Sequence, residues 1–193
     1  MRGLTLINYI LALPGIASAL TIHDYFKALV SYRLGDPYPK LHGRLRASNH
    51  LEPVGFLLAL VYGYGWGLPV NTSNIYYKNR KLGTLITYAA PSIINLLFAS
   101  SFFMLLSAAK QVSYTLGLGL PLSGQGFAQS IQTISGYGYT LKNIFSPTPI
   151  LLFLSGTIYQ IFYSFVRYNL SAALISLIPL YPLDGAVILE NYL

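Results

Sequence analysis

Residues 21–28 place an imidazole, a carboxylate and an amine within two turns of an otherwise apolar helical stretch. His23 and Lys27 are four residues apart and therefore share one helical face. A histidine with a second ligand at this spacing is the frame of the helical zinc motif H-E-x-x-H. Here Asp24 stands at the position of the glutamate and Lys27 at that of the second histidine. The frame is present, but two of its three chemical positions are changed.

The composition of the chain is typical of a membrane protein. Its 193 residues are 54% hydrophobic and only 9% charged, with a mean hydropathy of +0.53, whereas soluble domains carry about 25% charged residues. The lack of cysteine excludes disulfides and thiolate metal sites. The formal net charge of +7 is expected to face lipid head groups rather than nucleic acid. We predict one membrane domain over residues 1–193, with its first helix retained rather than cleaved as a signal peptide.

Several apolar segments are long enough to cross a bilayer, for which about 20 helical residues suffice. The expected spans are residues 3–32, 82–109, 148–166 and 169–190. Residues 54–70 are shorter and are broken by glycines and by Pro69, so we expect a re-entrant segment, with Glu52-Pro53 shaping the turn into it. The predicted fold class is all-α: a polytopic integral membrane protein with about four spanning helices and one re-entrant segment.

Two basic loops flank the re-entrant segment. Residues 33–53 carry four Lys or Arg and residues 78–81 carry three. Positive charge marks the cytoplasmic side, so both loops are expected there, in a membrane that the small size suggests is the prokaryotic cytoplasmic one. Pro37 and Pro39 predict an interruption of regular helix in the first loop. Residues 110–147 are expected to form a loop on the opposite side.

The last apolar segment is interrupted by Pro179 and Pro182, beside Leu183-Asp184-Gly185. Irregular backbone at membrane depth is tolerated only where it lines a cavity or packs on protein. The sequence therefore predicts that Asp184 lies at an internal site.

Short motifs rich in Gly, Pro and polar residues follow one another along most of the chain. In order they are the His23 motif, Gly35-Asp36-Pro37 with Pro39-Lys40, Gly43-Arg44-Leu45, His50 with Glu52-Pro53 and Gly55, Gly65-Trp66 with Pro69-Val70-Asn71, Ala90-Pro91 with Asn95, and Pro179, Pro182 and Leu183-Asp184-Gly185. No single motif is specific. The ordered set resembles the site-2 proteases, zinc metalloproteases that cut peptide bonds inside the membrane.

The resemblance implies roles for four residues. In that family the two histidines of H-E-x-x-H and the aspartate of Leu-Asp-Gly bind zinc, and the glutamate is the general base. By position, His23 matches the first ligand and Asp184 the third. Asp24 takes the position of the general base, and Lys27 that of the second ligand.

Two further departures from the family pattern concern the middle and the end of the chain. Asn95 follows Pro91 by one residue more than the usual spacing, and Ser176 stands where an asparagine is common. Asn95 is still expected to form a hydrogen bond within the bundle and to line the cavity.

The residue at position 27 argues against zinc hydrolysis. A catalytic zinc takes three protein ligands and keeps one open position, and an ammonium has no lone pair to give. The shorter Asp24 also changes the reach of a general base. The Lys27 ammonium can instead neutralise Asp184, so we predict an ion pair between them with His23 nearby. We therefore expect a catalytically degenerate pseudoenzyme without a cofactor. It would act as a binding, regulatory or structural subunit for transmembrane helices of client or partner proteins.

Other interpretations remain open from the sequence. The first is an active intramembrane zinc metalloprotease with non-standard ligands that cleaves single-span membrane proteins. His42 and His50 could complete an unusual zinc site from the loop, or a neutral Lys27 could act as a base. The second is an ion or proton pathway built from the ionisable groups near His23 together with Asp184.

Overall fold

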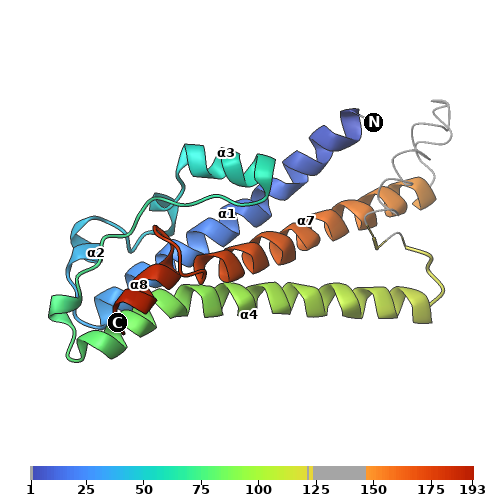
Figure 1. Cartoon of the computed structure of the whole chain (residues 1–193). Coiled ribbons are helices and arrows are strands. Elements are labelled where there is room, and N and C mark those ends of the chain that lie inside the picture. The colour runs from blue at the N-terminus through green and yellow to red at the C-terminus, as the bar shows by residue number, and fades with distance from the viewer. Residues whose placement is uncertain (1, 121, 124–146) are drawn as a thin grey trace.

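The computed structural model describes residues 2–120, 122–123 and 147–193, and this part of the chain is helical, without strands. Three long helices lie side by side and pack on one another (Figure 1). They are α1 (Arg2–Arg33), α4 (Arg80–Thr115) and α7 (Pro147–Ser176). The short helices are α2 (Tyr38–Leu41), η1 (Ala47–Asn49), α3 (Pro53–Tyr62), η2 (Asn74–Tyr76) and α8 (Asp184–Glu190). The predicted all-α class is confirmed.

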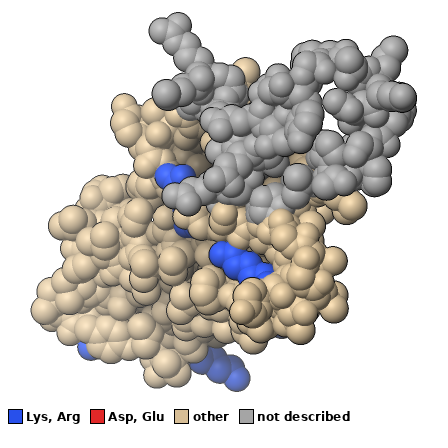
Figure 2. Space-filling model, turned by 90° about the vertical axis from the view of Figure 1, so that its right-hand side faces the viewer, with Lys and Arg blue, Asp and Glu red and all other residues tan. Residues whose placement is uncertain are grey.

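Two of the described helices, Leu6–Arg33 and Arg80–Thr115, are long and apolar enough to cross a membrane. Large apolar side chains cover their outer surface, as at Leu97, Phe103 and Met104 of α4, which are 59, 61 and 70% exposed. An apolar flank of this kind suits contact with lipid. Figure 2 views the molecule from the end at which α4 stops, where Lys and Arg are sparse and no Asp or Glu of the described residues is visible.

The predicted third and fourth spans, residues 148–166 and 169–190, are not two separate helices. α7 continues through Arg167 and ends only at Ser176. Residues 157–176 contain neither glycine nor proline, so no backbone feature stops the helix where the charge occurs. The break lies instead in the proline-containing turn before α8, which places Asp184 in the first turn of that short helix.

The chain between α1 and α4 leaves the first helix, forms α3 and turns back. Glu52 caps α3 by accepting hydrogen bonds from the amides of Val54 and Gly55, as expected for the turn at Glu52-Pro53. Gly63, with a φ of 82°, ends α3 in the left-handed region. The following extended segment runs back beside α1 toward α2 (Figure 1).

Helical structure extends further into two of the predicted loops than the sequence indicated. α2 forms over Tyr38–Leu41 although Pro37 and Pro39 predicted an interruption there. Proline is tolerated in the first helical turn because the amide it lacks would have no partner in the helix. The predicted loop 110–147 begins later, since α4 extends to Thr115, and most of it lies outside the described residues.

Glycine allows α1 and α7 to approach closely. A side chain at Gly15 would lie 2.5 Å from the backbone carbon of Ser164, so only glycine fits this helix crossing. Next to it, Ile16, Ala19 and Tyr168 form a buried apolar cluster. These contacts fix the polar half of α1 against the last part of α7 and the turn that carries Asp184.

Candidate functional site

A cavity of about 510 Å³ lies between α1, the extended segment after α3 and the turn between α7 and α8. Its polar wall consists of His23, Asp24 and Lys27 from α1 and Asp184 from α8. Its other walls include Trp66 and Gly67, Tyr181 to Leu183, and Ser176. The cavity brings together the two sequence motifs that the site prediction depended on.

The four ionisable side chains are in direct contact. Lys27 Nζ donates to Asp184 Oδ1 at 2.5 Å. His23 Nε2 lies 3.4 Å from Asp184 Oδ2, and its Nδ1 lies 3.1 Å from Asp24 Oδ1. The side chains of Lys27 and Asp184 are only 12 and 8% exposed. The structure thus places an almost buried lysine–aspartate pair at the position expected of a metal.

Lys27 has a further contact that sequence reasoning missed. Its Nζ lies 4.3 Å from the centre of the Tyr88 ring, a cation–π distance. The Tyr88 hydroxyl in turn lies 3.0 Å from Thr72 Oγ1. No spacing in the sequence links Tyr88 to Lys27, because the two residues belong to different long helices. The ring and the carboxylate therefore hold the amine between α4 and α8.

Three buried polar atoms of the site have no hydrogen-bond partner: His23 Nε2, Asp24 Oδ2 and Asp184 Oδ2. All three belong to residues that line the cavity. Buried polar groups in a packed core are almost always paired. The other three unpaired buried atoms of the described residues, on His50, Asn95 and Asn169, lie outside the cavity wall, so half of the unused hydrogen-bonding capacity is at this site.

The donor set does not fit a catalytic zinc ion. His23 Nε2 and Asp184 Oδ2 are two atoms of suitable type, but the third position is held by an ammonium that already bonds to Asp184. Within the described ranges, no group of three or more His, Cys, Asp or Glu side chains is placed to hold a metal. A zinc ion here would have two protein ligands and a cation as its neighbour.

The two loop histidines lie outside the cavity. His50 is fully buried, with Nε2 2.8 Å from the carbonyl oxygen of Arg44 and its ring edge against Tyr25. Burial lowers the pKa of His50 below its ordinary value of 6.5. His42 is exposed, stacks on Tyr38 and bonds to the carbonyl of that residue. Both histidines serve the local structure of the loop.

The hydrogen bond predicted for Asn95 within the bundle is present, but Asn95 does not line the cavity. It is fully buried between α4 and α1, and its amide donates to the carbonyl oxygen of Ala19 at 3.2 Å. That hydrogen bond holds its side chain against the backbone of α1. Ser176 does line the cavity and bonds to Ser92 at 2.6 Å.

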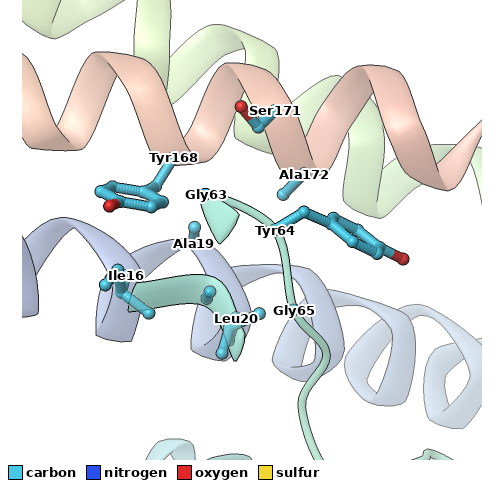
Figure 3. A pocket seen from close by; sticks show the side chains of 10 residues that line it. Ile16, Ala19, Leu20, Gly63, Tyr64, Gly65, Tyr168, Ser171 and Ala172 are labelled. Atoms are coloured by element: carbon cyan, nitrogen blue, oxygen red, sulfur yellow. The ribbon is translucent and has the colours of Figure 1, made fainter. Parts of the chain in front are cut away.

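A smaller cavity of about 10 Å³ adjoins the site (Figure 3). In this view the Gly63–Gly65 backbone passes between Ala19 and Leu20 of α1 and Tyr168 to Ala172 of α7. Tyr64 and Gly65 line both cavities. A side chain at Gly65 would collide with the carbonyl oxygen of Gly55. Close backbone packing therefore sets the position of the segment that carries Trp66 and Gly67.

Fold and site together define a class: an all-helical protein with candidate membrane spans, whose cavity joins a modified helical zinc motif to a Leu-Asp-Gly turn. The comparison with curated proteins agrees with this class. The chain is 30% identical over 176 residues, 90% of its length, to "Putative zinc metalloprotease YwhC" of Bacillus subtilis (strain 168). It spans 64% of the length of that relative. This similarity is consistent with the site-2 protease resemblance.

Two other comparisons gave no match. No family model matches the chain, and no solved structure matches it. The description of the site therefore depends on the residues themselves.

Proposed function

We propose that this chain is a catalytically degenerate, site-2-protease-like membrane protein that binds transmembrane segments of partner proteins as a regulatory or structural subunit. One observation carries the proposal: the Lys27 ammonium, at the position of the second zinc-binding histidine, lies 2.5 Å from Asp184 Oδ1. This pair supplies internally the positive charge that a metal ion would bring to the aspartate. Asp24, at the position of the general base, is then left without a metal-bound water to act on.

The proposal includes a membrane arrangement. α1, α4 and α7 are the spanning helices, and α3 with the segment that follows it is the re-entrant element. The basic loops 33–53 and 78–81 face the cytoplasm of a prokaryotic cell. His23 then lies about 15 Å along α1 from Arg33, which is about half the thickness of the hydrocarbon core.

The cavity supplies the surface on which a partner helix would bind. Trp66 and Tyr181, on two of its walls, are 47 and 87% exposed and offer apolar contact area. His23 and Asp24 on the polar wall carry buried unpaired atoms, which a movement of the side chains would bring within hydrogen-bond reach of a locally unwound partner backbone. Such a site would hold a transmembrane segment without cleaving it.

Site-specific photo-crosslinking in the native membrane tests this proposal. A photoreactive residue replacing Trp66 is expected to capture single-span partners intact, whereas one replacing the exposed Met104 of α4 captures none. The captured partner is then expressed with the wild-type chain, and its length is followed by gel electrophoresis. Equal capture from both positions, or cleavage that depends on His23 and Asp184, would contradict the proposal.

A second candidate is an active intramembrane zinc metalloprotease with a non-standard ligand set. The unpaired His23 Nε2 and Asp184 Oδ2 favour it, as does the name of the Bacillus subtilis relative. It requires Lys27 to leave Asp184 when metal binds. Cleavage of a single-span substrate by the reconstituted chain, abolished in His23→Ala and by chelator, would establish this candidate in place of the first.

A further inference from the structure

A second hollow, which we call the α7 groove, lies away from the Lys27 site, between the N-terminal half of α1, the end of α3 and the middle of α7. It has a volume of about 260 Å³, and its lining includes Asn8, Leu60, Val61, Gln160, Tyr163 and Arg167. Gln160, Tyr163 and Arg167 share one face of α7, since residues three, four and seven apart lie above one another. The helix therefore carries a polar stripe in an otherwise apolar sequence.

Arg167 has no counter-ion among the residues that the structure describes. The chain contains only five acidic residues, all in the described part. Asp24 and Asp184 contact His23 and Lys27, and Asp36 and Glu52 accept hydrogen bonds near α2 and α3. The fifth, Glu190, is the last residue of α8. No ion pair joins Arg167 to a described carboxylate. Its described neighbours are the Tyr168 ring, at 5.4 Å, and Gly63, where a side chain would lie 3.1 Å from the guanidinium.

An unpaired arginine is costly at the surface of membrane-embedded helices unless an anion or water reaches it. The negative end of the α3 dipole lies beside it at Gly63 and offsets part of its charge. The rest of its charge must be met by water or by a negative group from outside the described residues. A guanidinium flanked by amide and hydroxyl donors matches the oxygens of a phosphate, which it can bind through two parallel hydrogen bonds.

The level of the groove in the bilayer favours a lipid over a protein carboxylate. Ala12, which also lines the groove, lies about 31 Å along α1 from Arg33. This distance is close to the thickness of the hydrocarbon core, about 30 Å.

Arg167 lies between Ser164, which packs on Gly15, and Asn169, which bonds to Ser18, so its level is about 22–27 Å along α1 from Arg33. With Arg33 and the basic loops at one surface, the long side chain of Arg167 can extend toward the head groups of the opposite leaflet, which the groove reaches at Ala12. Beside the groove, Leu57 and Val61 of α3 are 59 and 62% exposed and provide apolar surface that an acyl chain can contact.

We propose that the α7 groove binds the phosphate of a phospholipid, with Arg167 as the charged contact and Asn8, Gln160 and Tyr163 as hydrogen-bond donors. The inference rests on the membrane arrangement proposed above, but not on the loss of zinc chemistry at the Lys27 site. An active protease would leave the groove unchanged. A lipid held there would join α3 to α7 and fix the segment that leads to Trp66.

Native mass spectrometry of the full chain in detergent tests the proposal with phosphatidylglycerol as the probe. The wild-type chain is expected to retain one phosphatidylglycerol, and Arg167→Gln to weaken its binding by about tenfold, because a charge-assisted contact is lost. Arg167→Lys is expected to fall between them, because it keeps the charge but not the planar fork. Arg46→Gln, an exposed arginine outside the groove, is the matched control and is expected to bind like wild type.

Competing probes identify the ligand. Diacylglycerol with the same acyl chains is expected to bind at least about tenfold more weakly, since it has no phosphate. Inorganic phosphate is expected not to displace the lipid at millimolar concentration. Equal binding of diacylglycerol, displacement by free phosphate, or unchanged lipid binding in both Arg167 variants would overturn the proposal. Release of a protein partner by Arg167→Gln with lipid binding intact would show that a carboxylate of that partner is the counter-ion instead.

Discussion

Two buried polar clusters lie at the same end of α1 and differ in how completely they are paired. Asp36 accepts hydrogen bonds from Ser31 Oγ, the amide of Ser73 and the amide of Tyr38, at 2.7, 2.7 and 3.0 Å. Ser31 continues the network to Tyr77. The cluster of His23, Asp24, Lys27 and Asp184 leaves three buried atoms unpaired beside a cavity.

The comparison separates a structural role from a binding role. The Asp36 cluster joins the end of α1 to α2 and to the segment before α4, and no atom of it is free to contact a ligand. The Lys27 cluster pairs the ammonium with Asp184 but leaves hydrogen-bonding capacity of His23, Asp24 and Asp184 unused. Substitutions should therefore affect stability in the first cluster and both stability and binding in the second.

The largest expected effect is that of Asp36→Ala. It would leave two backbone amides and the Ser31 hydroxyl without their acceptor in a fully buried place, which we expect to cost about 4 kcal/mol. Asp36→Asn keeps one acceptor oxygen and should cost less. Thermal unfolding of both variants in detergent, followed by circular dichroism, measures the difference. Equal stability of Asp36→Ala and wild type would contradict the structural role of the Asp36 cluster.

Lys27→Met is expected to have the next largest effect, about 3 kcal/mol, because it leaves the Asp184 carboxylate charged and unpaired at a nearly buried site. Asp184→Leu should be destabilising for the converse reason. The double variant should recover most of the loss, since neither charge remains. If the single changes reduce stability or accumulation no more than the double change, the pair does not contribute as described.

Gly67→Ala should have a smaller effect that links the cavity wall to the cluster. A methyl group there would collide with Asp24 Oδ2 and lie 2.7 Å from the carbonyl oxygen of His50. We expect a loss of about 1–2 kcal/mol, typical of overpacking, and weaker crosslinking from position 66. Combining it with Asp24→Ala removes the first collision and should restore part of the stability. No gain in the double variant would show that Asp24 does not lie against Gly67.

The smallest expected effect is a pH dependence from His50. Burial lowers its pKa in the folded state below 6.5, so the unfolded chain binds a proton that the folded chain does not. The contribution to stability is complete above about pH 6.5 and is lost as the pH falls, by at most about 1.4 kcal/mol per pH unit. The free energy of unfolding of wild type and of His50→Gln is measured between about pH 7.5 and pH 5.5, on both sides of the ordinary histidine pKa. It should fall less steeply with decreasing pH in the variant. Parallel slopes would contradict this assignment.

The sequence predicted the parts of the fold that depend on composition and on proline. The helical class, the turn before Asp184 and the cap at Glu52 follow from apolar length, from Pro179 and Pro182, and from the Glu-Pro pair. The predicted division into spans at 148–166 and 169–190 is wrong because it assumes that the helix ends at the charged residue Arg167. A charge does not stop a helix when the backbone lacks a breaker.

The sequence predicted only those residues of the site that belong to its two motifs. His23, Lys27 and Asp184 share the cavity that their spacing and the Leu-Asp-Gly turn indicated. Asn95 lies elsewhere because its amide bonds to the backbone of α1. No sequence pattern indicated the contact of Tyr88 with Lys27 or the α7 groove, because both depend on which faces of α4 and α7 pack against α1.

The zinc content of the purified full chain tests the central claim most directly. The proposal predicts well below about 0.1 zinc per wild-type chain by mass spectrometry after equilibration with excess zinc and removal of the unbound metal, because Lys27 gives no lone pair. Lys27→His completes three ligands with His23 and Asp184 and is expected to bind about one zinc per chain. About one zinc per wild-type chain, lost in His23→Ala, would contradict the claim.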